Sequence, residues 1–168
     1  MVEFSWNPER KARRLTTSVI LPCSREELFE FFSDAFQLER ITPPWLNFRI
    51  LTPAPIDVKA GTLIDYKLRL RGIPIRWRTE ISRWDPPYSF VDRQLKGPYL
   101  LWEHLHTFEE TEQGVVVADE VHYRVPGGGL ADRLLVRKEL ERIFNYRTQQ
   151  MVAIFDQAPQ PEPKSTLS

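Results

Sequence analysis

The sequence lacks most of the features that mark secreted, membrane-spanning or disulfide-bonded proteins. Cys23 is the only cysteine, so an internal disulfide and a cysteine-rich metal site are both excluded, and the chain fits a reducing compartment. No stretch approaches the roughly 18 uncharged apolar residues of a membrane span. Residues 1–14 are charged and contain no apolar segment of the signal-peptide type. We therefore expect a cytoplasmic protein without stable membrane insertion.

Net charge and the common catalytic motifs are also missing. The 23 basic and 23 acidic residues balance, so we expect no nucleic-acid partner. The basic residues Arg137, Arg142 and Arg147 alternate with glutamates and predict a solvated helix face. No dinucleotide-binding glycine motif, nucleophile elbow or His-Glu-x-x-His motif is present. The glycines at 127–129 lack the further glycine and lysine of a phosphate loop.

The first part of the chain predicts one strand followed by two short helices. Residues 15–21 are rich in β-branched side chains, which are typical of a strand. Ser24 and Glu27 have the spacing of a capping box, which predicts the start of a helix. A second short helix is expected around residues 38–41, because two prolines follow shortly afterwards and cannot continue it.

From residue 47 to residue 125 the apolar side chains recur at every second position. In residues 62–71 the even positions are apolar and most of the odd ones are charged, which predicts a strand with one buried and one wet face. Residues 75–81 repeat this alternation. Turn residues separate the segments, as is typical of antiparallel hairpins. We therefore expect about seven strands in one curved antiparallel sheet.

A long helix is expected after the sheet. The Pro-Gly-Gly-Gly segment at 126–129 predicts a flexible joint. Residues 130–155, including Leu130 and Leu134, carry apolar side chains at helical spacing without internal proline or glycine. At about 1.5 Å per residue, such a helix would reach across the whole sheet. Residues 1–156 are predicted to form one ligand-binding domain, and the proline-rich residues 157–168 a disordered tail.

Several local motifs resemble bacterial ligand-binding proteins of the SRPBCC superfamily, also termed START-like or Bet v 1-like. Within it they are similar to an uncharacterised branch sometimes labelled cell-division-inhibitor-like. The motifs are 84–87 (WDPP), 90–92 (FVD), 97–99 (GPY), 102–108 (WEHLHTF), 119–123 (DEVHY) and 143–147 (IFNYR). The resemblance covers most of the chain.

The resemblance implies an α+β helix-grip fold. In this fold a curved antiparallel sheet wraps around a long C-terminal helix, and two short helices follow the first strand. The superfamily includes lipid carriers, hormone receptors, polyketide cyclases and chaperone activators. The resemblance therefore specifies the fold and leaves the chemistry open. We expect no cofactor.

Two histidines are the main candidates for chemistry. Trp102, His104, His106 and Phe108 alternate along one expected strand and share one of its faces. The histidines could be core residues paired with neighbouring acceptors, or they could orient a ligand and transfer protons. They could also supply two metal ligands with Asp119 as a third, but no further cluster completes such a site, so we expect no metal. If the protein is an enzyme, His104 and His106 are its candidate catalytic residues.

Polar residues on the two neighbouring strands could surround this pair. Asp92 and Gln94 precede the histidine strand and Asp119 follows it, each sharing a strand face with apolar residues. If those faces point inward, the carboxylates would raise the histidine pKa values, and their own pKa values would tend to fall. The group is either a structural network that fixes the strand register or a polar floor in an apolar pocket.

Large aromatic residues on the inner strand faces are expected either to fill the core or to line a cavity. A long helix that spans a curved sheet leaves a gap that side chains fill only partly, which favours the cavity. The expected ligand-binding residues are Tyr66, Trp77, Asp92, Gln94, Trp102, His104, His106, Asp119, Tyr123 and Phe144.

From these features we predict binding of a small hydrophobic or aromatic molecule or a lipid, by a carrier, sensor or scavenger. One alternative is a cyclase or dehydratase-type enzyme in which His104 or His106 moves a proton and Asp92 or Asp119 orients it. Another is an adaptor for a protein partner whose identity the sequence does not specify. The identity of the ligand and the oligomeric state are not specified either.

Overall fold

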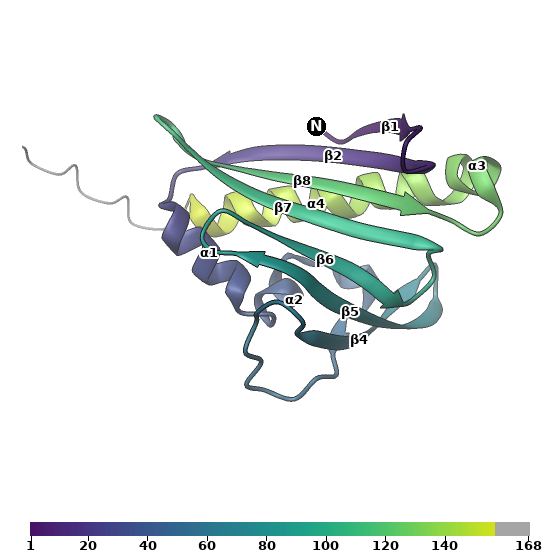
Figure 1. Ribbon diagram of the computed structural model, residues 1–168, viewed down its shortest axis with the longest axis horizontal. Coiled ribbons are helices and arrows are strands. Elements are labelled where there is room, and N and C mark those ends of the chain that lie inside the picture. Colours follow the sequence, from purple (N-terminus) through teal and green to yellow (C-terminus); the bar gives the residue numbers. More distant parts are fainter. Residues whose placement is uncertain (157–168) are drawn as a thin grey trace, which may run out of the picture.

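The computed structural model describes residues 1–156, in which one antiparallel sheet packs against a long helical segment (Figure 1). The tail expected at residues 157–168 lies outside the described residues. Neighbouring strands pair in the order β1-β2-β8-β7-β6-β5-β4-β3. The strands are β1 Glu3–Asn7, β2 Ala12–Leu21, β3 Arg49–Ile50, β4 Leu63–Leu70, β5 Ile73–Asp85, β6 Ser89–Lys96, β7 Leu101–Thr111 and β8 Gly114–Arg124.

Helices lie between β2 and β3 and after β8. At the start of the first one, Ser24 Oγ accepts a hydrogen bond from the Glu27 amide at 3.2 Å, as the capping box predicts. The helical segments are α1 Arg25–Ser33, α2 Gln37–Ile41, the 3₁₀ turn η1 Pro44–Leu46, α3 Gly128–Ala131, the π-helical turn η2 Asp132–Val136, and α4 Arg137–Phe155. The expected order of elements, with two short helices after the strand at 15–21 and a long helix at the end, is confirmed.

The sheet has eight strands in the described residues, one more than the sequence predicted. The additional strand is β1, which pairs only with β2 and forms an edge of the sheet. Its residues are mostly exposed or half-buried, and Trp6 is an exposed member. A mostly exposed edge strand shows no clear alternation of apolar and polar residues, so the pattern did not reveal it.

The C-terminal helix is not uniform over 130–155. The π-helical turn η2 interrupts it, and Leu130 and Leu134 are 69% and 62% exposed instead of packing on the sheet. A π-helical turn holds more residues than an α-helical turn, so it shifts the phase of the apolar face. In α4, by contrast, Leu140 and Phe144 are buried, as the helical spacing predicts.

Two apolar clusters tie the helix to opposite ends of the sheet. One combines α1 and the end of α4, where Leu28 and Phe29 meet Phe155. The other combines β2, β8 and the start of α4, where Leu15 and Tyr123 are fully buried. The interior beside these clusters, towards β4, β5 and β6, is left to a cavity.

Candidate functional site

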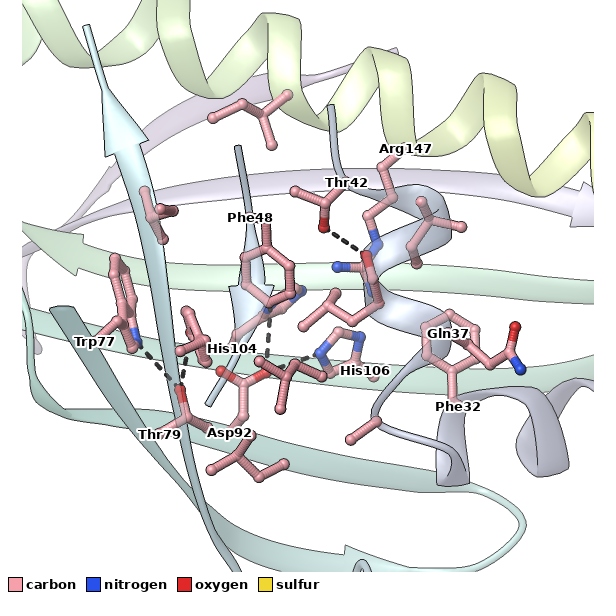
Figure 2. Close-up of a pocket in the computed structure, with 18 of the residues that line it drawn as sticks. Phe32, Gln37, Thr42, Phe48, Trp77, Thr79, Asp92, His104, His106 and Arg147 are labelled. Carbon is pink, nitrogen blue, oxygen red and sulfur yellow. Dashed lines mark hydrogen bonds and ion pairs between the residues drawn. The ribbon is translucent and has the colours of Figure 1, made fainter. Parts of the chain in front are cut away.

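A cavity of about 200 Å³ lies among α1, α2, strands β4 to β7 and helix α4 (Figure 2). Most of its wall is aromatic or aliphatic, including Phe48, Tyr66 and Trp102. Its few polar groups include Thr79, Asp92, His104, His106 and Arg147. An apolar cavity with a small number of convergent polar groups is the usual form of a small-molecule site.

The structure brings seven of the ten sequence-predicted site residues to the wall of this cavity. They are Tyr66, Trp77, Asp92, Trp102, His104, His106 and Phe144. The other three, Gln94, Asp119 and Tyr123, are not part of the wall. Gln94 donates a hydrogen bond to the Tyr99 carbonyl at 2.7 Å and accepts one from the Tyr99 amide, which ties the two ends of the β6–β7 turn together. The Tyr123 hydroxyl donates to buried Asp132 at 2.8 Å.

Strand register explains how the two histidines meet two aspartates. Asp92 on β6 lies directly opposite His104 on β7, and His106 lies directly opposite Asp119 on β8. Directly opposite residues of antiparallel strands share a face of the sheet. All four side chains therefore lie on the inner face and form a cluster, which we term the Asp–His cluster.

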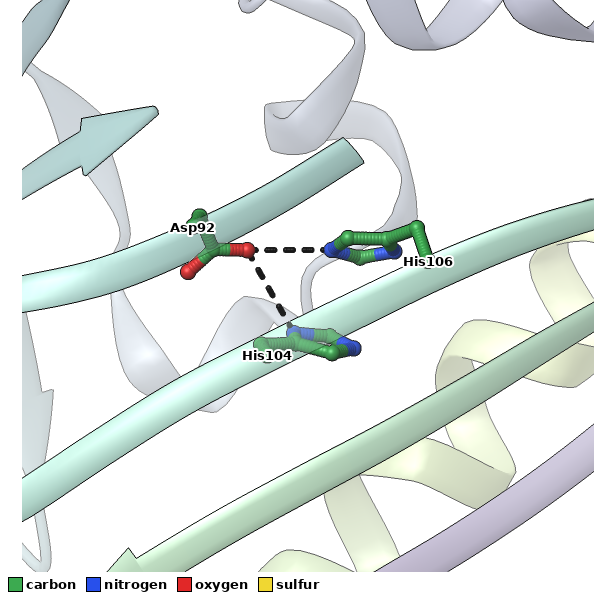
Figure 3. A group of neighbouring side chains, drawn as sticks. All are labelled: Asp92, His104 and His106. Carbon is green, nitrogen blue, oxygen red and sulfur yellow. Dashed lines mark hydrogen bonds and ion pairs between the residues drawn. The ribbon is translucent and has the colours of Figure 1, made fainter. Parts of the chain in front are cut away.

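Each imidazole of the Asp–His cluster lies between the two carboxylates. His104 Nε2 is 2.8 Å from Asp119 Oδ1, and His106 Nε2 is 3.0 Å from Asp92 Oδ2. The Nδ1 atoms of the two rings are less well paired than the Nε2 atoms. His104 Nδ1 is 3.6 Å from Asp92 Oδ2, which is beyond hydrogen-bond distance (Figure 3). His106 Nδ1 is 2.9 Å from Asp119 Oδ1 but has no aligned hydrogen-bond partner among the described residues. The two ring centroids are only 3.7 Å apart.

These contacts give the two histidines opposite pKa shifts. Burial and the charge of His106 lower the pKa of His104, and they outweigh its aspartate contacts. Burial also opposes the charged form of His106, but Asp119 and Asp92 prevail and raise its pKa. The carboxylates therefore raise both histidine pKa values, as expected, but at His104 burial and the charge of His106 outweigh them and the net pKa falls. A positive charge on one ring disfavours a second charge on a ring in van der Waals contact with it.

The two aspartates stay ionised despite their burial. Burial alone would raise the pKa of Asp92, but the hydrogen bond with His106 and the nearby cations lower it. Burial is likewise outweighed at Asp119, where Arg147 and the hydrogen bonds with both histidines hold the pKa well below its usual range. The shifts therefore favour ionised carboxylates at both aspartates, and they favour a positive charge on His106 over one on His104.

Three atoms of the cluster could also hold a divalent ion. One ligand atom each from Asp92, His104 and His106 lie within 4.8 Å of one another (Figure 3). Asp119 contacts both rings from the neighbouring strand. A proton on His106 already pairs that ring with Asp92, however, and Arg147 adds a positive charge beside the cluster. The sequence-based expectation of no metal therefore stays a prediction.

Arg147 and Thr79 are cavity residues that the sequence analysis missed. Arg147 was expected on the solvated face of the last helix, but it lines the cavity beside the Asp–His cluster (Figure 2). Its position three residues after Phe144 and four before Met151, both buried, places it on the buried face and could have revealed this. Thr79 Oγ1 lies 3.1 Å from the hydroxyl of Tyr66 and accepts a hydrogen bond from the indole of Trp77 at 3.1 Å.

No family model and no curated protein matches the sequence. Solved structures do match it. The protein Ms6760 from Mycobacterium smegmatis is 16% identical over 93% of this chain and 98% of its own, with a TM-score of 0.66. Ara h 8.0201 is 12% identical over 88% and 99%, with a TM-score of 0.65.

A third similar structure is the di-domain ARO/CYC StfQ from the steffimycin biosynthetic pathway. It is 14% identical over 85% of this chain and 50% of its own, with a TM-score of 0.68. At these identities the similarity concerns the fold. The chain has the Bet v 1-like helix-grip fold, as its motifs implied. No helix within residues 1–156 combines the length and apolarity needed to cross a membrane.

Proposed function

We propose that residues 1–156 form a binding domain for a small hydrophobic or aromatic molecule or a lipid, which acts as a carrier, sensor or scavenger. The observation that carries this proposal is the cavity itself, which has an aromatic wall and a single polar cluster on its sheet side. Burial of apolar ligand surface contributes about 25 cal/mol per Å², so an apolar guest gains affinity from nearly every wall residue.

The arrangement of the aromatic rings supports a preformed site. Trp77 stacks with Tyr66 at a centroid distance of 5.8 Å and meets Trp102 edge to face at 5.5 Å. Thr79 holds the polar ends of both Tyr66 and Trp77. Because these polar ends are paired within the wall, the ring surfaces are left for an apolar ligand, and little side-chain entropy is lost when it binds.

Fluorescence titration with the neutral apolar probe N-phenylnaphthylamine tests this function. Trp77→Ala and Trp102→Ala should weaken probe binding, because each removes part of the cavity wall. Trp77→Ala should also cost about 3 to 5 kcal/mol of stability, since Trp77 is buried. Trp6→Ala removes an exposed tryptophan far from the wall and serves as the matched control. Unchanged probe binding by both folded cavity variants contradicts the proposal.

Native mass spectrometry gives an independent test that needs no chosen probe. Protein purified without added ligand should carry a co-purifying small molecule, since an apolar cavity is costly to leave to water. The mass of that molecule identifies its class. The Trp77→Ala variant should retain less of it than the Trp6→Ala control.

A cyclase or dehydratase-type reaction is a second candidate function. Its supporting observation is that His106, with a raised pKa, and His104, with a lowered pKa, lie side by side at the cavity, an arrangement that suits a proton donor and a proton acceptor. The ARO/CYC StfQ has a similar fold. In this case His106→Gln should abolish turnover of a polyketide-like substrate while retaining probe binding. A variant that retains full turnover excludes His106 as the proton donor.

A further inference from the structure

Arg147 is a cation inside an apolar cavity. Its side chain extends from α4 towards His106, and no other lysine or arginine among the described residues lines the cavity (Figure 2). The guanidinium lies 5.5 Å from the ring centroid of Phe32, which covers it on one side. Its Nε atom is buried and has no hydrogen-bond partner among residues 1–156.

Other arginines of the same helix are paired. Arg137 Nε donates to Asp132 at 2.9 Å, and Arg142 lies 3.8 Å from Glu139. Arg147, by contrast, has no ion pair within 4.0 Å in the part of the chain that the structure describes. The side chain as a whole is half-buried, but a guanidinium has five N–H donors and no acceptor, so its buried Nε–H group without a partner carries a cost. This cost falls when an acceptor enters the cavity.

The nearby carboxylates do not fill this role. Arg147 is close enough to help lower the pKa of Asp92 and of Asp119. Neither carboxylate, however, forms an ion pair with Arg147 within 4.0 Å among the described residues, and Asp119 Oδ1 and Asp92 Oδ2 are instead paired with His104 and His106. The second carboxylate of the wall itself, Asp34, accepts hydrogen bonds from the Gln37 side chain at 2.9 Å and from the Phe36 amide. The donors of Arg147 therefore remain available to a ligand.

We propose that the ligand of this cavity is an amphipathic acid whose anionic head group binds Arg147, while its apolar or aromatic body packs against Trp77 and Trp102. This inference rests on the proposed function and names its ligand class. The planar fork of N–H donors suits an oxyanion with two acceptor oxygens, such as a carboxylate or a sulfonate.

A pair of probes that share one aromatic skeleton tests the inference. Anilinonaphthalene sulfonate is N-phenylnaphthylamine with an added sulfonate, and the sulfonate stays ionised across the working pH range. The experiment is a fluorescence titration of both probes against the wild type and Arg147→Met, which retains the apolar stem and removes the charge. Arg142→Met, on the exposed face of the same helix, is the control.

Arg147→Met should weaken binding of the sulfonate by about tenfold to a hundredfold, the range for a hydrogen-bonded charge pair. The neutral probe should change by less than about twofold, and the control should change neither affinity. An equal change for both probes in Arg147→Met overturns the inference while leaving the proposed function intact. Wild type that binds neither probe contradicts the proposed function, and the inference falls with it.

A measurement on the wild type covers the case in which Arg147→Met does not fold. The arginine Nε–H signals in a nitrogen-15 NMR spectrum should include one that shifts when the sulfonate is added and does not shift with the neutral probe. Arg147→Lys, which retains the charge and lacks the Nε donor, assigns that signal by its loss. If every arginine Nε–H signal responds equally to the two probes, the head group does not bind Arg147.

Discussion

At the scale of single residues, the two histidines differ because of where their partners stand. Both rings contact both aspartates, but these contacts outweigh burial only at His106, whereas at His104 burial and the neighbouring His106 prevail and lower the pKa. The shifts act on stability with opposite signs. The raised pKa of His106 stabilises the fold below the unfolded value of 6.5, and this contribution is lost as pH rises through the folded pKa. The lowered pKa of His104 instead costs stability as pH falls below 6.5.

His106→Gln should therefore destabilise the protein more at about pH 5.5 than at about pH 9. Urea denaturation of the wild type and the variant at both pH values measures this difference. His104→Gln should show the opposite trend with pH, and His122→Gln, outside the cluster, should follow the His104 trend because burial also lowers the pKa of His122. The same pH trend in His106→Gln and His104→Gln would contradict the opposite pKa shifts.

The Asp–His cluster can either stay protonated at its histidines or bind a metal ion in place of those protons. Because a proton pairs His106 with Asp92 and Arg147 lies nearby, we expect the protein to need no metal. Dialysis against a chelator should leave the melting temperature and probe affinity unchanged, and added zinc should not raise either. Asp92→Asn reports on the alternative, since a zinc-dependent rise in melting temperature that this variant abolishes would establish a metal site.

At the scale of elements, residues 126–130 after β8 are all exposed, whereas the π-helical turn that follows is held by buried Asp132, which is paired with Tyr123, Arg13 and Arg137. Gly127 and Gly128 have positive φ angles of 84° and 67°, a conformation that favours glycine. The segment that follows exposes Leu130 and Leu134 and is tied to the β4–β5 hairpin by a hydrogen bond from Arg71 to the Leu135 carbonyl at 2.9 Å. Few buried contacts mean a low cost of local opening.

We predict that the joint at residues 126–129, together with the loops between strands, opens to admit the ligand, although none of residues 126–136 lines the cavity wall. The amide hydrogens of the joint should exchange faster than those of α4, and N-phenylnaphthylamine should slow them, because a bound ligand adds contacts to the closed state. Hydrogen exchange with mass spectrometry measures both effects. The edge strand β1 provides an internal control that ligand should not affect. Protection of the joint equal to that of α4, with no response to ligand, contradicts the prediction.

The elements differ in how well the sequence predicted them. Strands such as β4 have one wet and one buried face, so their alternation is visible in the sequence. The long helix α4 was visible for the same reason, through buried residues at helical spacing. The edge strand β1 could not be predicted, because few of its side chains are buried. The π-helical turn could not be predicted either, because it breaks the helical period on which the prediction depends.

The residues of the cavity could be predicted only in part, because the alternation of apolar and polar residues does not specify which side chains meet across neighbouring strands. Alternation placed His104 and His106 on one face, but pairing them with Asp92 and Asp119 required the strand register, which the sequence does not give. Arg147 was missed because its charge suggested solvent, although its spacing from Phe144 placed it inside. Buried charged residues are exceptions to the hydrophobic pattern, and here such exceptions form the site.

At the scale of the whole molecule, charged groups of the two layers meet at the cavity. On the sheet, two carboxylates with lowered pKa values contact two histidines, of which His106 has the raised pKa, and Arg147 on α4 is the cation that lies beside them. An anionic ligand bound at Arg147 adds a negative charge to this closed interior. The neutral ring of His104 is the group that can offset it, because a nearby anion raises a histidine pKa.

Binding of anilinonaphthalene sulfonate should therefore be accompanied by proton uptake, and its affinity should rise as pH falls towards about 6. Titration calorimetry in buffers of different ionisation enthalpy counts the protons taken up. The neutral probe, which adds no charge, should take up none. His104→Gln should remove the uptake and flatten the pH dependence while Arg147 continues to bind the sulfonate. Proton uptake that persists in His104→Gln would show that a group other than His104 takes up the proton. Equal proton uptake with the charged and the neutral probe would show that uptake does not depend on the charge of the ligand.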